Sequence, residues 1–248
     1  MSRLKDKVAV VTGASKGIGA SIAKALASEG ASVVVNYSSA RSDADKVVTQ
    51  IRNQGGKAIA LQADVSKASD VQRLFEETKK AFGKIDVLVN NAGVYEFAPI
   101  GDFTEEQFRR MFDTNVLGVL LASREASKYF GEGGAIINIG SVVTQLTPPA
   151  SAVYAGTKAA VDAITRVLAK ELGPKRIRVN SINPGMVETE GVHAAGIIGS
   201  DFQKQAEAQT PLGRIGQPED IAPLAVFLAS QDSGWLTGEL VTAAGGMR

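Results

Sequence analysis

The sequence predicts an α/β fold in which helices cover both faces of a doubly wound, parallel β-sheet. Short runs rich in Val and Ile alternate with longer segments of helical periodicity, starting near the N-terminus. Each run is apolar at nearly every position, which is typical of strands buried on both faces. The connections are short and no low-complexity linker interrupts them, so one domain over residues 1–248 is favoured over two.

The expected elements follow one another in regular order. Strands are expected at 7–13, 32–37, 57–65, 85–93, 135–141 and 176–185, and helices at 21–30, 43–56, 68–83 and 151–172. Gly30 and the Gly55–Gly56 pair stop the first two helices, as glycine commonly does. The segment 103–115 has apolar residues at helical spacing, so its charges are expected on an exposed face.

Composition excludes several classes of function. The chain has 27 Lys and Arg against 26 Asp and Glu, so nothing indicates a nucleic acid or an acidic membrane surface as a partner. The absence of cysteine removes disulfides, thiolate catalysis and cysteine metal sites, and it fits a reducing compartment. The longest apolar run, 221–229, is far shorter than the roughly 20 residues of a membrane-spanning helix. We therefore expect a cytoplasmic protein without a metal site.

The stretch from about Glu188 to Gly216 breaks the alternation. It contains several glycines but little clean periodicity, which is compatible with a substrate lid or with a surface excursion. His193, the only histidine, lies here without ligand-like neighbours and is interpreted as a lid or surface residue. Trp235 is expected to pack near the C-terminal strand.

A glycine-rich turn follows the first expected strand. Gly13, Gly17 and Gly19 allow a tight turn whose backbone N–H groups can approach a pyrophosphate at a helix N-terminus. The second strand ends in Asn36 and Tyr37, where sites that choose NAD usually carry a carboxylate for the ribose 2′-hydroxyl.

The charge near that strand end is positive instead. Lys16 lies in the glycine turn and Arg41 lies just beyond the second strand. Both would attract a 2′-phosphate, which favours NADP(H) over NAD(H), although both could also be solvated surface cations.

Several motifs in the right order resemble the short-chain dehydrogenase/reductase family, whose members have a single-domain Rossmann fold. The matching residues are Thr12–Gly13, Gly17–Ile18–Gly19, Asn90–Asn91–Ala92–Gly93, Asn115, Ser141, Tyr154, Lys158, Pro184–Gly185 and Thr189. Asn115, Ser141, Tyr154 and Lys158 match the catalytic tetrad of the family, and the resemblance covers nearly the whole chain.

The resemblance implies a set of cofactor contacts. Asp64 would bind the adenine with Val65 beside it, residues 91–93 would line the adenosine ribose, and Val187 and Thr189 would hold the nicotinamide carboxamide. The full expected set is Thr12, Gly13, Ser15, Lys16, Gly17, Ile18, Gly19, Asn36, Tyr37, Ser38, Asp64, Val65, Asn91, Ala92, Gly93, Tyr154, Lys158, Pro184, Gly185, Val187 and Thr189. The family also suggests a homotetramer whose main contact uses the helices beginning near Glu105 and Ser151.

Tyr154 and Lys158 are one helical turn apart, so their side chains share a face. A free tyrosine has a pKa of about 10, and a neighbouring cation favours the phenolate. Tyr154 is therefore the expected proton donor in ketone reduction and Lys158 the group that lowers its pKa. Ser141 would donate a hydrogen bond to the substrate oxygen, and Asn115 would anchor a water in a proton relay, as the family pattern suggests.

The substrate stays open at this point. The segment after Asn91 lacks the Arg-Asp pair of many 3-oxoacyl-carrier-protein reductases, so a carbonyl reductase is favoured and that reductase is the alternative. Tyr95, Glu96, Val142, Val143, Gln145 and Met186 flank the motifs and are candidate pocket residues. A non-catalytic NADP-binding regulatory protein is the alternative from another class; a cofactor-free ligand-binding scaffold conflicts with the glycine turn.

Overall fold

A computed structural model describes residues 2–247. Its centre is a seven-stranded sheet in the order β3-β2-β1-β4-β5-β6-β7, and every neighbouring pair is parallel. The strands are β1 (Val8–Val11), β2 (Ser32–Tyr37), β3 (Lys57–Gln62), β4 (Ile85–Asn90), β5 (Phe130–Ile139), β6 (Ile177–Pro184) and β7 (Leu240–Ala243). The predicted doubly wound α/β fold is confirmed.

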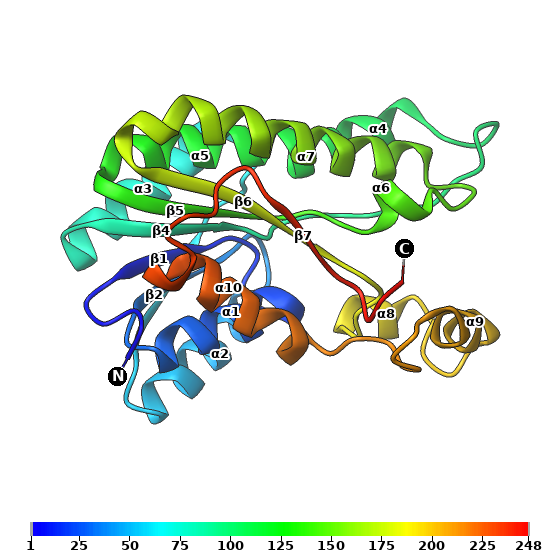
Figure 1. Cartoon of the computed structure of the whole chain (residues 1–248), viewed down its shortest axis with the longest axis horizontal. Coiled ribbons are helices and arrows are strands. Elements are labelled where there is room, and N and C mark those ends of the chain that lie inside the picture. The colour runs from blue at the N-terminus through cyan, green and yellow to red at the C-terminus, as the bar shows by residue number, and fades with distance from the viewer. Residues whose placement is uncertain (1, 248) are drawn as a thin grey trace.

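Helices form a layer on each side of the sheet (Figure 1). One layer contains α1 (Gly17–Ser28), α2 (Arg41–Asn53) and α10 (Pro218–Ala229). The other contains α3 (Ala68–Phe82), α4 (Glu105–Phe112), the π-helical turn η1 (Asp113–Leu117), α5 (Gly118–Tyr129) and α7 (Ala152–Leu172). The shorter elements are α6 (Val143–Leu146), α8 (Glu190–Ala194), α9 (Asp201–Gln209) and the 3-10 turns η2 (Gly173–Lys175) and η3 (Gln231–Ser233).

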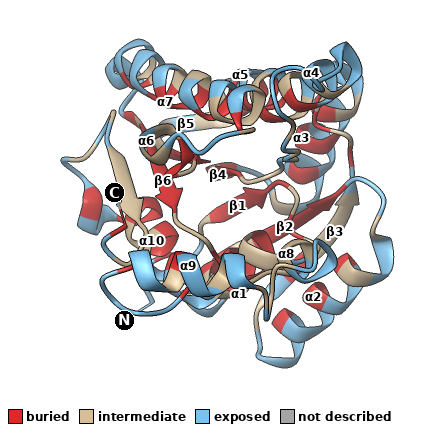
Figure 2. Ribbon diagram, turned by 90° about the vertical axis from the view of Figure 1, so that its right-hand side faces the viewer, coloured by how far each residue is buried: buried red, intermediate tan, exposed pale blue. Residues whose placement is uncertain are grey.

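The core lies between the sheet and these layers, and Figure 2 shows buried strands between helices whose outer faces are exposed. The core has two parts, one on each face of the sheet, because successive side chains of a strand such as β1 point to opposite faces. Ala9 and Val11 join the cluster under α1 and α10, whereas Val10 joins the cluster under α3 and α5. The expected exposed face of 105–112 is confirmed, since only Met111 is buried there.

Two expectations need correction. The stretch 188–216 is not irregular throughout, because it contains α8 and α9; their one buried side chain, Ala206, leaves almost no apolar periodicity to read. Trp235 does not pack, because its side chain is 98% exposed in the turn after η3. Within residues 2–247, no helix has the length and apolarity needed to cross a membrane.

The strand order positions the functional residues. The chain leaves β1 toward β2 and β3, and returns to place β4 on the other side of β1. Ligands of open α/β sheets bind outside the carboxyl ends of the strands at such a switch point. The glycine turn after β1 and residues 91–93 after β4 meet there.

Candidate active site

The glycine turn lies against the end of β4. Gly13 and Gly17 have φ values of 60° and 56°, a backbone region that favours glycine. A Cβ on Gly13 would lie 2.8 Å from the Cα of Ala92, so a larger residue would force the turn away from the sheet. No side chain within the described residues caps the start of α1 at Lys16, so its first amide groups are available to an anion. This donor set fits a dinucleotide pyrophosphate.

Polar side chains of the motifs fasten this turn. The hydroxyl of Thr12 accepts hydrogen bonds from the backbone N–H groups of Asn91 and Ala92, at 2.9 and 3.0 Å. The amide of Asn91 donates in return to the carbonyls of Thr12 and Gly13, at 2.9 and 3.0 Å. Thr12 and the Asn91 side chain therefore hold the cofactor loop in place, a bracing role that the motif alone did not indicate.

Asn36 fastens the same turn from β2. Its side-chain oxygen accepts a hydrogen bond from the N–H of Gly13 at 3.2 Å. Its amide nitrogen donates to the carbonyls of Ala63 and Leu61, at 3.1 and 3.3 Å. Since Asn36 is only 1% exposed, its side chain supports the turn from within.

Two basic residues follow the ends of the paired strands β1 and β2. Lys16 is exposed beside the glycine turn, and Arg41 is the first residue of α2. The guanidinium of Arg41 lies 3.6 Å from the Asp45 carboxylate in an exposed pair, which is worth little in water. Ser38, the first residue after β2, is exposed, whereas Tyr37 is buried.

The expected adenine residues lie at the loop after β3. The Asp64 carboxylate accepts hydrogen bonds from the N–H and the hydroxyl of Ser66, at 3.0 and 2.7 Å. Val65 is buried against Gly118, where a Cβ would come within 2.8 Å of its side chain. Asp64 orders this loop, and Val65 anchors it to the start of α5.

The four residues predicted as catalytic converge from three elements. Ser141 follows β5, Tyr154 and Lys158 lie on α7, and Asn115 lies in η1. The ammonium of Lys158 donates to the carbonyl of Ile139 at 2.8 Å and lies 5.8 Å from the centre of the Tyr154 ring. A Cβ on Gly93 would be 3.3 Å from the Asn115 oxygen and 3.7 Å from the Lys158 nitrogen.

Asn115 ties these elements together. Its oxygen accepts from the N–H of Val94 and its amide donates to the Val94 carbonyl, both at 2.8 Å. The amide also donates to the hydroxyl of Thr157 at 3.1 Å, and that hydroxyl donates to the Tyr154 carbonyl at 2.7 Å. Asn115 is thus bonded both to the loop after β4 and to α7, and π-helical turns such as η1 frequently mark functional sites.

The pKa of Tyr154 differs from the value expected from the sequence. Burial raises the pKa of Tyr154, and a hydrogen bond with Ser141 opposes that rise only in part. The expected lowered pKa of Tyr154 is therefore wrong for the protein alone, because the loss of water around the phenol dominates. Burial also lowers the pKa of Lys158 to about 8.

A buried acid on α7 was missed by sequence reasoning. Asp162 lies one turn beyond Lys158, and its carboxylate accepts from the amide of Asn183 at 3.1 Å and the hydroxyl of Thr144 at 3.2 Å. Burial raises the pKa of Asp162. The available signal was a charge on the face that already carried Tyr154 and Lys158. Asp162 links α7 to β6 and α6.

The expected nicotinamide segment runs from the end of β6 into α8. Pro184 and Gly185 carry the chain past β7, where a Cβ on Gly185 would be 2.9 Å from the Ala244 backbone. Val187 pairs with Gly216 in an isolated bridge, which closes the base of the segment 188–216.

The next residues cover the glycine turn. Thr189 begins α8, and a Cβ on Gly17 would lie 3.2 Å from its methyl group. His193 pairs with Glu188 at 2.7 Å on the exposed side of α8.

Aromatic rings flank Tyr154. The ring centres of Tyr95 and Phe97 lie 6.1 and 5.9 Å from that of Tyr154, in edge-on orientations. Tyr95 was among the candidate pocket residues; Phe97 was missed, although its position two residues after Tyr95 places it on the same side of an extended segment.

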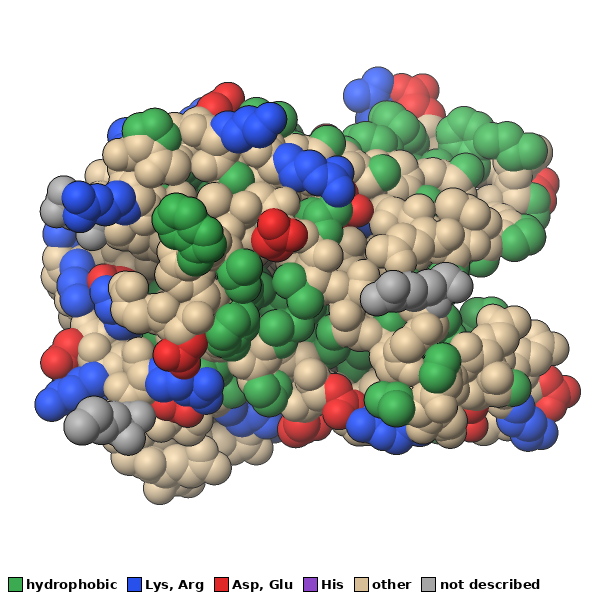
Figure 3. All heavy atoms as spheres, viewed as in Figure 1, with side chains coloured by type: hydrophobic (Ala, Val, Ile, Leu, Met, Phe, Trp, Pro, Cys, Tyr) green, Lys and Arg blue, Asp and Glu red, His purple; other side chains and the backbone are tan. Residues whose placement is uncertain are grey.

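The other candidate pocket residues lie in different surroundings. Val142 and Val143 are buried, and the Gln145 amide donates to the Thr242 hydroxyl at 3.1 Å. Met186 lines a cavity of about 240 Å³ between the segment 188–216 and the chain after β7. The space-filling view shows the surface notched at this end of the molecule (Figure 3).

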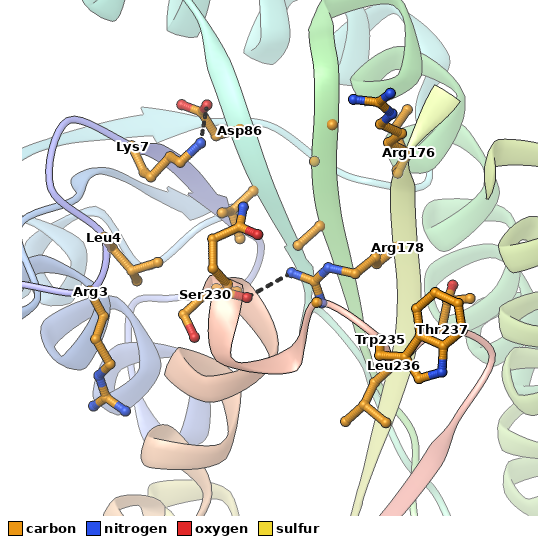
Figure 4. A pocket seen from close by; sticks show the side chains of 18 of the residues that line it. Arg3, Leu4, Lys7, Asp86, Arg176, Arg178, Ser230, Trp235, Leu236 and Thr237 are labelled. Carbon is orange, nitrogen blue, oxygen red and sulfur yellow. Dashed lines mark hydrogen bonds and ion pairs between the residues drawn. The ribbon is translucent and has the colours of Figure 1, made fainter. Parts of the chain in front are cut away.

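A larger cavity of about 620 Å³ lies at the opposite, amino edge of the sheet. Figure 4 shows Lys7 paired with Asp86 there, and Arg178 bonded to the carbonyl of Ser230 at 3.0 Å. None of the residues expected to bind a cofactor or to be catalytic lines this cavity in the described part of the chain.

Comparisons with known proteins identify the family of the chain. A family model described as "Enoyl-(Acyl carrier protein) reductase" matches residues 13–248. An uncharacterized oxidoreductase of Methylorubrum extorquens is 62% identical over all of both chains. Elsinochrome reductase 1 of Elsinoe fawcettii is 42% identical, and a probable tetrahydroxynaphthalene reductase of Zymoseptoria tritici is 40% identical; each match covers 97% of this chain and 94% of the relative.

Solved structures show the same architecture. A short-chain dehydrogenase/reductase from Serratia marcescens superposes with a TM-score of 0.94 at 37% identity, covering 99% of both chains. A short chain dehydrogenase from Burkholderia cenocepacia, solved in complex with NADP, has a TM-score of 0.90 at 35% identity, also over 99% of both chains. The chain belongs to the short-chain dehydrogenase/reductase family.

Proposed function

We propose that this protein is an NADP(H)-dependent oxidoreductase that reduces a ketone to an alcohol reversibly, with Asn115, Ser141, Tyr154 and Lys158 as its catalytic residues. The observation that carries the proposal is the meeting of Lys158 with the end of β5, beside Tyr154 and next to Gly93 at the end of β4. In this arrangement one helix presents a proton donor and a cation at the switch point of the sheet.

The proposed chemistry assigns one step to each group. The bound cofactor supplies the hydride. Tyr154 donates a proton to the substrate oxygen in reduction, and its raised pKa keeps the phenol protonated near neutrality. The Ser141 oxygen accepts from the N–H of Val143 at 3.1 Å. Its O–H, which is bonded to Tyr154 in the protein alone, would donate to the same substrate oxygen when a ketone is bound. Lys158 holds the ribose hydroxyls and supplies positive charge beside Tyr154.

The preference for NADP(H) has electrostatic support. Lys16 and Arg41 follow the ends of the paired strands β1 and β2, and β2 ends in Asn36 and Tyr37 without a carboxylate. A 2′-phosphate would form charge-assisted hydrogen bonds with such cations. The NADP complex of the Burkholderia cenocepacia relative agrees with this preference.

The substrate class rests on the relatives' names. Two relatives are named as reductases of elsinochrome and of tetrahydroxynaphthalene, which supports carbonyl reduction. The description of the family model favours a second candidate, reduction of the acyl chain of a carrier-protein thioester, at the C=C bond of an enoyl chain or at the ketone of a 3-oxoacyl chain. A panel of ketones, a 3-oxoacyl thioester and an enoyl thioester, followed by loss of NADPH absorbance, separates these functions.

We expect fastest turnover with a simple ketone. Faster turnover of the 3-oxoacyl thioester would keep carbonyl reduction but assign it to a carrier-protein substrate, and faster turnover of the enoyl thioester would replace carbonyl reduction with reduction of a C=C bond. NADPH binding without turnover of any substrate would support the non-catalytic, regulatory alternative.

The quaternary structure is a further part of the proposal. Phe108, Leu117, Leu120 and Val167 are 40–52% exposed on α4, η1, α5 and α7. Burying such side chains would stabilise a homotetramer through this helical layer. Light scattering of the purified protein would give four chains; a monomer would refute this part. We also propose that residues 1–248 act as one domain and that 188–216 is the substrate lid.

A further inference from the structure

We propose that Tyr95 and Phe97 form a rigid aromatic wall beside Tyr154 that selects planar, aromatic ketones. This inference rests on the proposed function, because it names the substrate class of the same site. The two rings lie 6.0 Å apart, and each meets the Tyr154 ring edge-on, at interplanar angles of 60° and 71°. Edge-to-face contacts of this kind are favourable between aromatic rings.

The wall leaves apolar ring surface open next to the proposed proton donor. Tyr95 is 40% exposed and Phe97 is 51% exposed, whereas residues such as Val142 and Val143 are buried. A flat ring system can stack on such surfaces with many atoms in contact, and a puckered saturated ring contacts fewer.

The backbone beneath the wall is fastened at alternate residues. Val94 exchanges two hydrogen bonds of 2.8 Å with the side chain of Asn115. The N–H of Ala98 donates to the carbonyl of Ala150, just before α7, at 2.9 Å. These anchors hold both ends of the segment that carries the two rings.

Glu96 lies between the two aromatic residues in the sequence, and its side chain is bonded to α4. Glu96 accepts a hydrogen bond from the Gln107 side chain and lies 4.0 Å from the Arg110 guanidinium, both on α4. Its charge is thereby directed to α4 and away from the rings on either side of it. The wall is pre-organised, so little conformational entropy is lost when a substrate binds.

The segment 188–216 completes the wall at its far end. A Cβ on Gly191 would lie 3.1 Å from the Tyr95 hydroxyl, so the ring of Tyr95 spans the distance between Tyr154 and the first turn of α8. A larger residue at position 191 would press against the hydroxyl end of that ring. The wall therefore extends from the catalytic helix to the proposed lid.

The test compares a planar and a puckered ketone of the same skeleton, 1-tetralone and 1-decalone. We expect the wild-type protein to have the larger kcat/KM for 1-tetralone. Phe97→Leu keeps an apolar side chain but removes the ring, and should lower the 1-tetralone to 1-decalone ratio of kcat/KM about 5-fold. Trp235→Leu removes an exposed ring at the opposite edge of the sheet and should leave the ratio unchanged.

The proposal would be overturned if Phe97→Leu left the 1-tetralone to 1-decalone ratio of kcat/KM unchanged, or changed it no more than Trp235→Leu does. If the wild-type protein reduced neither ketone, the wall would be judged by binding alone, and the full ketone panel would decide whether the proposed ketone reduction fails. Calorimetry with 2-naphthol in the presence of NADP would then decide. A Kd about 5-fold weaker in Phe97→Leu supports the wall, and an equal Kd overturns it.

Discussion

The ammonium of Lys158 donates a 2.8 Å hydrogen bond to the backbone carbonyl of Ile139, two residues before Ser141. This bond fixes the end of β5 relative to the helix that carries Tyr154. It also explains how a fully buried lysine is tolerated, because a buried charge without a hydrogen-bond partner would cost several kcal/mol. Burial still destabilises the charged form of Lys158, so its pKa falls from 10.5 to about 8.

That depression makes stability depend on pH in a defined direction. Below about pH 8 Lys158 is protonated in both states, so the folded state carries the whole cost of burial. Between about 8 and 10.5 the unfolded chain binds the extra proton, so stability rises with pH. Denaturant unfolding should show the wild-type protein gaining about 2 kcal/mol relative to Lys158→Met between about pH 7 and 9.5. A pH-independent difference between the two proteins would contradict the buried cation.

The same group should control the pH profile of reduction. The raised pKa of Tyr154 keeps its proton in place, so the loss of the Lys158 proton is the first change on raising the pH. The kcat/KM for NADPH, which reports the free enzyme, should be level near neutrality and fall above about pH 8. A profile that rises through this range would show that the two groups have other roles.

Cofactor preference should respond to the charge beside β2. Arg41→Asp replaces a cation by an anion near the proposed 2′-phosphate, and should lower the NADPH to NADH ratio of kcat/KM by roughly 10-fold or more. Lys46→Asp makes the same change of charge one turn further along α2, where Lys46 pairs with Asp43, and serves as the control. Equal or better use of NADH by the wild-type protein would refute the preference itself.

A variant of Asn36 tests whether this side chain stabilises the fold or only contacts the cofactor. Asn36→Asp removes the donor to the carbonyls of Leu61 and Ala63 and places a carboxylate against them. We expect a loss of about 2–4 kcal/mol in the free energy of unfolding without cofactor. Asn53→Asp, at an exposed position, should cost far less. If Asn36→Asp were as stable as the wild-type protein, the bracing of the glycine turn would be disproved.

The candidate site could be placed from the sequence because parallel strands end at one edge of the sheet. The glycine turn, the Asn91 segment and Ser141 each follow a strand, so their meeting follows from the fold class alone. The spacing of Tyr154 and Lys158 placed both on one helical face in the same way.

Other features depend on packing between distant segments. The pKa of Tyr154 is set by how deeply α7 is covered, which no local pattern reveals. The bracing by Asn36 joins three strands, and Phe97 reaches Tyr154 only because the loop after β4 is fastened to Asn115. Trp235 is expected from the sequence to pack near the C-terminal strand, but large apolar residues are often left at the surface.

The central claim is that the Tyr154 phenol delivers the proton to the ketone. Tyr154→Phe keeps the ring that contacts Tyr95 and Phe97 and removes only the hydroxyl. The variant should unfold at nearly the same temperature and bind NADPH with nearly the same Kd, while kcat for the best ketone falls at least about 100-fold. Turnover close to that of the wild-type protein would contradict the account.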